Sequence, residues 1–220
     1  MSLDITRTAI RTRVRTMINE PTARFITDTE LNIWINDAAR DVSVRTFCST
    51  IIASSFATVN GTQQYAWPTV YGPGAATTPI VTLGIKTIIN SDETALEYIP
   101  MDMIGRVGQE GSTQEMKWST WHQTIFLSPM PTAAYTLVPI IWIACETSGS
   151  GTIPRLPPYV HHLVPMYCIA MAREKRRDYE KAQSEWQRYE SALDRIVMTV
   201  THYDTWIDGL KKPRDQAPGG

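Results

Sequence analysis

Residues 27–42 read TDTELNIWINDAARDV, and this stretch decides how the fold begins. The Thr27 hydroxyl can accept a hydrogen bond from the Glu30 amide while the Glu30 carboxylate reaches back to the amide of Thr27, which is the reciprocal capping box of a helix N-terminus. The apolar residues that follow recur every three or four positions, as one buried helix face requires, and are Leu31, Trp34, Ile35, Ala38, Ala39 and Val42. The stretch therefore predicts a capped amphipathic helix.

Another helix is expected upstream, over residues 3–18. Its apolar residues stand at helical spacing and are Leu3, Ile10, Val14, Met17 and Ile18. The proline at position 21 ends this helix, because a proline disfavours α geometry in the residue before it. Two helices joined by a short turn predict an αα-hairpin.

The first helix also carries Arg7, Arg11 and Arg15 at intervals of four residues, which predicts a basic ridge along it. Like charges at this spacing slightly disfavour an isolated helix, so we expect anions outside the helix to compensate them. A partner's carboxylates and the phosphates of a nucleic acid are the candidates. The intramolecular alternative is pairing with acidic residues of the C-terminal helix, such as Glu180 or Glu185.

From about residue 50 to 148 the pattern changes to short β-rich runs separated by glycine, proline and asparagine. Asn60-Gly61 is a strong signal for a two-residue hairpin, because both positions tolerate positive φ. The prolines of this zone, Pro139 among them, suit strand ends and sheet edges better than central strands. We expect a small antiparallel sandwich or barrel of about seven strands, with runs at 51–59, 64–67, 80–89, 96–99, 116–121, 124–127 and 135–143.

A long amphipathic helix is expected in the last quarter of the chain, after a segment of linker composition at 147–152, TSGSGT. A stripe steps by three and four residues in turn, as one helix face requires, through Tyr179, Ala182, Trp186, Tyr189, Leu193, Ile196 and Val200. We interpret its members Tyr179, Trp186, Tyr189 and Leu193 as contacts of the helical core or between subunits. Residues 203–220 are rich in turn-forming residues and predict a tail that orders on a partner.

Together these segments predict an α+β protein. The N-terminal αα-hairpin and the long C-terminal helix are expected to form one helical bundle, with an antiparallel β domain inserted between them and an extended C-terminal tail. The expected boundaries are 1–49 for the N-terminal helices, 50–148 for the β domain, 149–202 for the linker and C-terminal helices, and 203–220 for the tail.

Composition narrows the possible functions. The chain has 220 residues, with 21 basic and 22 acidic side chains and a formal net charge of -1, which argues against a strongly cationic nucleic-acid binder. Cys48, Cys145 and Cys168 lie far apart and indicate reduced thiols rather than a disulfide framework or a metal site. No apolar run approaches the about 20 residues of a bilayer span, so we expect a soluble protein without a signal peptide.

Catalytic signatures are missing from the sequence. It contains no phosphate-binding glycine loop, GxSxG, HExxH or paired CxxC, and we expect no catalytic residue, no metal and no cofactor. His122 is interpreted as part of an aromatic contact patch rather than as a general base. Glu93, Glu97, Glu110 and Glu115 are interpreted as solvated loop charge; a hydrolase would have to draw its pair of carboxylates from them.

Several motifs follow one another in a fixed order along nearly the whole chain, beginning with the Arg-rich helix. They are TDxELxxWxNxA at 27–38, NGTxxYxWP at 60–68, LSPxP at 127–131, LPxY at 156–159 and DxxxA at 178–182. This order resembles the head–tail adaptor (connector) proteins of tailed double-stranded-DNA bacteriophages, including the tubular tail proteins of short-tailed phages.

The resemblance implies a structural protein that forms a ring, typically of twelve copies, beneath the portal at the capsid vertex. Such rings dock the downstream tail or nozzle protein and surround the channel through which DNA is packaged and ejected, so the basic ridge is expected to face the lumen or a partner. The C-terminal tails commonly insert into the portal, which makes Tyr203, Trp206, Ile207 and Leu210 the docking candidates. The protein is expected in the virion at the head–tail junction, after synthesis in the host cytoplasm, and not in a membrane.

Two alternatives belong to other functional classes. A tail-associated peptidoglycan hydrolase would use carboxylates of the β domain, and its activity would depend on one of the glutamates named above. A free nucleic-acid-binding module would bind DNA as a monomer with a steep dependence on salt.

Overall fold

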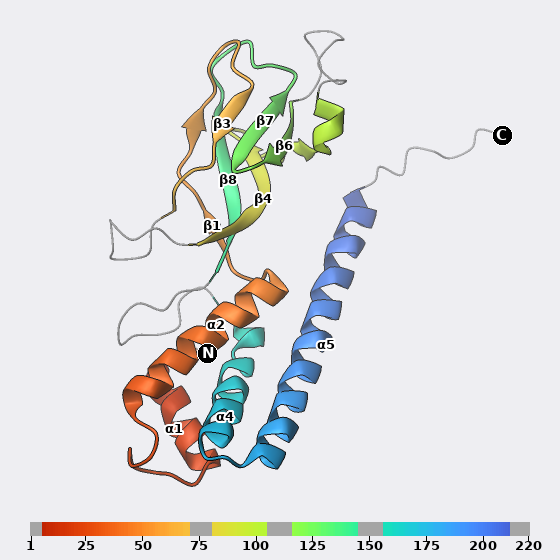
Figure 1. Cartoon of the computed structure of the whole chain (residues 1–220). Helices are drawn as coiled ribbons and strands as arrows, with labels where there is room; N and C mark the ends of the chain where they lie inside the picture. Colours follow the sequence, from red (N-terminus) through yellow and green to blue (C-terminus); the bar gives the residue numbers. More distant parts are fainter. Residues whose placement is uncertain (1–5, 71–80, 105–115, 145–155, 212–220) are drawn as a thin grey trace, which may run out of the picture. The chain divides into compact units, whose positions relative to one another are not determined.

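The computed structural model describes residues 6–70, 81–104, 116–144 and 156–211, with the backbone alone for residues 200–211. The chain divides into two compact units. One is helical and consists of Met1–Cys48 with Thr147–Gly220; the other consists of Ser49–Glu146 and contains the β-strands. Figure 1 labels the described α-helices and most of the strands. The protein is thus α+β, as the sequence predicts.

In the part of the chain that the structure describes, the helical unit contains four α-helices and a 3-10 turn. These are α1 (Arg7–Met17), α2 (Asp28–Thr46), η2 (Pro158–Val160), α4 (Leu163–Lys175) and α5 (Tyr179–Lys211). Helix α4 packs against the other three helices, and α2 also packs against α1 and α5. The core of this unit therefore joins segments from both ends of the sequence.

Helix α2 forms as the opening stretch predicts. The capping box is present in both directions, with the Glu30 amide donating to the Thr27 hydroxyl at 3.2 Å and the Thr27 amide donating to the Glu30 carboxylate at 2.9 Å. All six residues of the predicted apolar stripe are buried. In α1, Ile10, Val14 and Ile18 are buried as expected, but Met17 is 55% exposed. The prediction for Met17 is wrong because that side of α1 faces solvent.

Helix α5 corrects the expectation of an extended tail from residue 203. The helix continues to Lys211, so residues 203–211 are helical, and residues 212–220 lie outside the described chain. The physical reason lies in the sequence itself. Tyr203, Ile207 and Leu210 continue the alternating steps of three and four residues that start at Tyr179, and such a pattern favours a helix.

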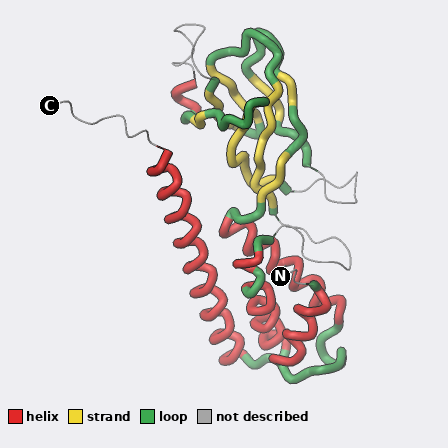
Figure 2. The backbone as a smooth tube through the Cα atoms, turned by 180° about the vertical axis from the view of Figure 1, so that it is seen from behind, coloured by secondary structure: helices red, strands yellow, loops and turns green. Residues whose placement is uncertain are grey.

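Among its described residues, the β unit contains two sheets, whose strands are drawn in yellow in Figure 2. In one sheet, β4 lies along one side of β8, while β1 and β2 pair in turn along the other side. The second sheet has the order β3-β7-β6-β5. The bounds are β1 Thr50–Ile52, β2 Phe56–Ala57, β3 Gln64–Ala66, β4 Thr82–Asn90, β5 Glu97–Tyr98, η1 Met101–Met103, β6 Lys117–Trp121, β7 Thr124–Ser128 and β8 Thr136–Ile143.

An apolar core joins the two sheets. Ile85, Ile88 and Ile141 enter it from the first sheet, and Trp118 and Leu127 enter it from the second. Side chains of β8 alternate between buried and less buried positions, as a strand with one face on a core requires. The described strands lie within or close to the runs expected from the sequence, but the expected run at 51–59 is divided into β1 and β2.

Three expectations about strand pairing are wrong. Asn60-Gly61 does form a turn, with Gly61 at φ 75°, but the flanking strands β2 and β3 pair with different sheets. The sheets are not wholly antiparallel, because β5 pairs with β6 in parallel. Pro139 lies in the central strand β8, opposite Ile88.

The position of Pro139 has a simple explanation. Its carbonyl accepts from the amide of Ala53 at 2.9 Å, so the ring nitrogen, which has no hydrogen, points to the same side of β8. That side is where β1 ends and β2 has not yet begun. The missing donor therefore falls in a gap of the ladder and leaves no strand partner unsatisfied.

Candidate functional site

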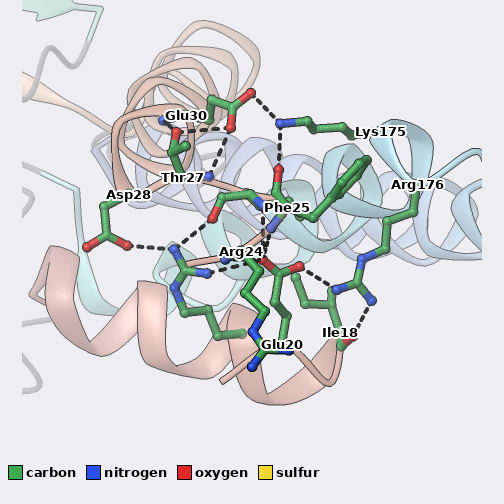
Figure 3. Close-up of polar contacts among 11 residues, drawn as sticks. Ile18, Glu20, Arg24, Phe25, Thr27, Asp28, Glu30, Lys175 and Arg176 are labelled. Carbon is green, nitrogen blue, oxygen red and sulfur yellow. Dashed lines mark hydrogen bonds and ion pairs between the residues drawn. The ribbon is translucent and has the colours of Figure 1, made fainter. Parts of the chain in front are cut away.

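The loop between α1 and α2 is held from within by one carboxylate. Glu20 accepts hydrogen bonds from three successive backbone amides, those of Arg24 at 3.2 Å, Phe25 at 2.8 Å and Ile26 at 2.9 Å (Figure 3). A carboxylate with several amide donors substitutes for the backbone partners that an irregular loop lacks. The side chain of Glu20 thus sets the path of the chain into α2.

Two arginines approach the same carboxylate from different helices. Arg176, just after α4, donates to Glu20 and to the carbonyl of Ile18. Arg15 of α1 lies 3.7 Å from Glu20 and donates to the carbonyl of Ile26 at 2.9 Å. Burial alone would raise the pKa of Glu20, but the amide and Arg176 hydrogen bonds outweigh it and lower the pKa to about 2. The carboxylate is therefore ionised at neutral pH although it is only 5% exposed.

The capping box of α2 is joined to the same network. Lys175 of α4 donates to Glu30 at 2.5 Å and to the carbonyl of Phe25 at 2.9 Å, and its ammonium lies 5.1 Å from the centroid of the Phe25 ring (Figure 3). The hydrogen bonds from Lys175 and Thr27 lower the pKa of Glu30 to about 2. The N-terminus of α2 is thereby tied to the C-terminal end of α4.

This arrangement holds the loop between α1 and α2 in one position. Arg173 also donates to the carbonyl of Met17, so cations at the end of α4 fix both ends of the loop. The fixed loop carries Phe25, which is 51% exposed, and Met17 at the end of α1 is exposed too. Where the pKa of a described carboxylate is shifted, the shift is downward, away from that of a general acid. In the described ranges, no cluster of His, Cys, Asp or Glu suits a metal ion.

Comparison with known protein families shows the family of the chain. The family model described as SU10 adaptor protein matches residues 5–210. The chain belongs to the SU10 adaptor protein family. This is a family of phage head–tail adaptors, so the resemblance seen in the sequence is confirmed and the role of the protein is structural. Among curated proteins, none gave a significant match to the sequence.

The match covers nearly all described residues of both units. Because phage head–tail adaptors are parts of the phage particle, this SU10 family member is a component of the virion. Among its described helices, none has the length and apolarity that crossing a membrane requires.

The predicted basic ridge of this family member lies mostly inside the helical unit. Arg7 and Arg15 are each 7% exposed. Arg7 donates to Asn36 at 2.7 Å, and Arg15 donates to Asp28 at 2.6 Å. Arg11, which is partly exposed, donates to the same Asp28 at 3.1 Å. Arg7 and Arg15 therefore do not form an exposed ridge with Arg11, because Arg15 pairs with Asp28 and Arg7 is held by the neutral amide of Asn36. A role of the three arginines toward a channel or a partner stays a prediction.

The predicted stripe of α5 separates into buried and exposed parts. Tyr189 and Leu193 are fully buried, Trp186 is half-buried and Tyr179 is 66% exposed. Burial and the hydrogen bond to Asp41 raise the pKa of Tyr189 above its ordinary range. A role of this stripe between subunits stays a prediction, and so does docking by Tyr203, Trp206, Ile207 and Leu210, whose side chains lie outside the described part of the chain.

Replacing Trp186 by alanine tests the packing of this stripe. The indole N–H donates to Glu174 at 2.7 Å, and the ring meets Tyr167 edge-on at 5.0 Å between centroids. Because Trp186 is half-buried, we expect a loss of about 2 kcal/mol in the free energy of unfolding, below the about 3–5 kcal/mol of a fully buried tryptophan. Urea unfolding measures it. Trp186→Phe, which keeps a ring, should lose about half as much, and a loss above about 4 kcal/mol for alanine would contradict the half-buried position.

The candidate residues of the β unit do not converge on a site. His122 is exposed on the turn between β6 and β7, where its ring meets that of Trp121 edge-on at 4.9 Å. Glu97 pairs with Lys117 at 2.7 Å. Glu93 is exposed on a turn, and Glu110 and Glu115 lie outside the described residues.

Sequence reasoning missed two networks. The Glu20 cluster has no local signature, because Arg176 lies 156 positions away. The other is Tyr65, whose hydroxyl accepts from the amide of Val59 at 3.0 Å and donates to the carbonyl of Thr62 at 2.8 Å. This tyrosine closes the turn at Asn60-Gly61. The spacing NGTxxY in the sequence is the signal from which this network could have been predicted.

Proposed function

We propose that the protein forms a ring of twelve copies beneath the portal and joins it to the downstream tail or nozzle protein. The family match over residues 5–210 carries this proposal. In this proposal the ring surrounds the channel through which DNA is packaged and ejected, and the protein has no catalytic activity.

The fixed loop between α1 and α2 supports a role in assembly. A surface that is rigid before binding loses little conformational freedom on binding, which favours affinity. The network around Glu20 gives this rigidity to a loop that carries Phe25, an exposed aromatic side chain of the kind enriched at interfaces.

We place the contact with the portal at the C-terminal end of α5. Residues 203–211 are helical, so docking uses an amphipathic helix with Tyr203, Ile207 and Leu210 on the sequence stripe and Trp206 beside it. Such helices bind apolar grooves through side chains spaced by three and four residues.

The number of copies on the portal tests the proposed ring. Native mass spectrometry of purified portal mixed with an excess of the protein should give a full ring on each portal. The free protein serves as the control. A monomeric free protein agrees with the proposal, because the portal acts as the template for the ring. A saturated complex that holds a single copy, or a virion that lacks the protein, would contradict the proposal.

A further inference from the structure

We propose that, within this ring, the outward face of α1 packs against the groove along α5 of the next copy. The inference rests on the ring proposed above and adds the surfaces that hold neighbouring copies together. Its occupant is a second copy of this chain.

The groove runs along the first half of α5 and ends at Glu174 of α4. It has a volume of about 530 Å³, and its apolar wall includes Tyr179 and Trp186. The charged side chains that line it are all carboxylates, Glu174, Glu190 and Asp194. Glu190 is paired with Arg45, whereas Asp194 has no ion-pair partner among the described residues. The groove therefore presents aromatic surface with uncompensated negative charge.

The outward face of α1 has the opposite character. It carries Thr12, Arg13, Thr16 and Met17, all exposed, and α1 contains no acidic residue. Arg24, also exposed, follows in the loop fixed by Glu20. In the described part of the chain, neither Arg13 nor Arg24 has an ion-pair partner. Small side chains around Arg13 let another helix approach closely, and Met17 suits an aromatic wall because methionine sulfur contacts rings favourably.

The two surfaces lie on different flanks of the helical unit. Helices α1 and α5 both pack on α2 and α4, and α4 lies between them in both views (Figures 1 and 2). A contact between different patches of two identical chains is heterologous, and such contacts close into rings when the rotation between copies allows it. A basic face on one flank and an acidic groove on the other therefore fit repeated head-to-tail contact, and the charges favour one orientation.

Charge reversal in two separate variants tests this contact. One variant carries Arg13→Glu and Arg24→Glu; the other carries Glu174→Lys and Asp194→Lys. Each variant alone places like charges across every contact between copies, so we expect at least a tenfold weaker loading of further copies onto the portal. A mixture of the two can alternate around the ring with opposite charges at every contact, so it should load fully. Native mass spectrometry of the portal complexes counts the copies.

A matched variant controls for net charge. Arg188→Glu with Arg195→Glu makes the same change on exposed positions of α5 outside the groove, and it should load as the unchanged protein does. Full loading by either reversed variant alone, or no recovery in the mixture, overturns the inference. If the ring itself does not form, the result is different: the unchanged protein would then also load only one copy onto the portal.

Discussion

Truncation after Asp204 is expected to abolish binding to the portal while the helical unit stays folded. Arg45, one residue before the end of α2, bonds to Glu190 of α5 at 2.5 Å. From Glu190 the helix continues to Lys211. This part of the helix is about 30 Å long at roughly 1.5 Å per residue. The buried residues Tyr189 and Leu193 remain in the truncated chain, so its core is intact.

Binding of the truncated protein to immobilised portal measures this effect, and circular dichroism checks the fold. A second truncation, after Lys211, is the matched control. It keeps Tyr203, Trp206, Ile207 and Leu210, so we expect it to bind as the full chain does. Unchanged binding after the first truncation would refute the docking role of this segment, and loss after the second would move the contact to the last nine residues, 212–220.

Replacing Glu20 by alanine is expected to lower the free energy of unfolding by about 3–5 kcal/mol, the usual cost of removing one partner from a buried ion pair. Three backbone amides lose their acceptor, and Arg176 loses its carboxylate. Urea unfolding at neutral pH measures the loss. Asp194→Ala, at an exposed position in the middle of α5, is the control and should change stability by less than about 0.5 kcal/mol.

Glu20→Gln isolates the contribution of the charge through its pH dependence. The pKa of Glu20 is about 2 in the folded protein against 4.5 for an ordinary glutamate, so the ionised form stabilises the fold at any pH above 4.5. The stability difference between the two proteins should be about 3 kcal/mol at neutral pH. It should shrink as the pH falls from about 4.5 towards 2, where the folded protein also binds the proton. A difference that does not depend on pH would show that the charge does not matter.

The helices and strands could largely be predicted because their signals are local. The capping box and apolar stripe of α2 depend on residues within one helix, and both are confirmed. Strand positions follow from alternation along short runs. Which strands pair is a different matter, since β2 and β3 lie on either side of one turn and still belong to different sheets.

The candidate site could not be predicted because its partners are distant in sequence. Periodicity treats an arginine as exposed and a methionine as buried, and α1 has the reverse at Arg15 and Met17. Arg15 is buried because its guanidinium finds acceptors at Ile26 and Asp28. No local pattern reports such acceptors.

The β unit begins and ends on neighbouring strands, since Thr50 of β1 pairs with Trp142 of β8 and the amide of Ile143 donates to the carbonyl of Ser49 at 3.0 Å. Ser49 and Ile143, near the two ends of this unit, are therefore separated by about 5 Å, the spacing of adjacent strands. A segment with adjacent ends can be exchanged, enlarged or deleted during evolution without stretching the chain that carries it. Exchange of the residues between Ser49 and Ile143 for a segment with equally close ends therefore leaves the chain on either side of them unstretched.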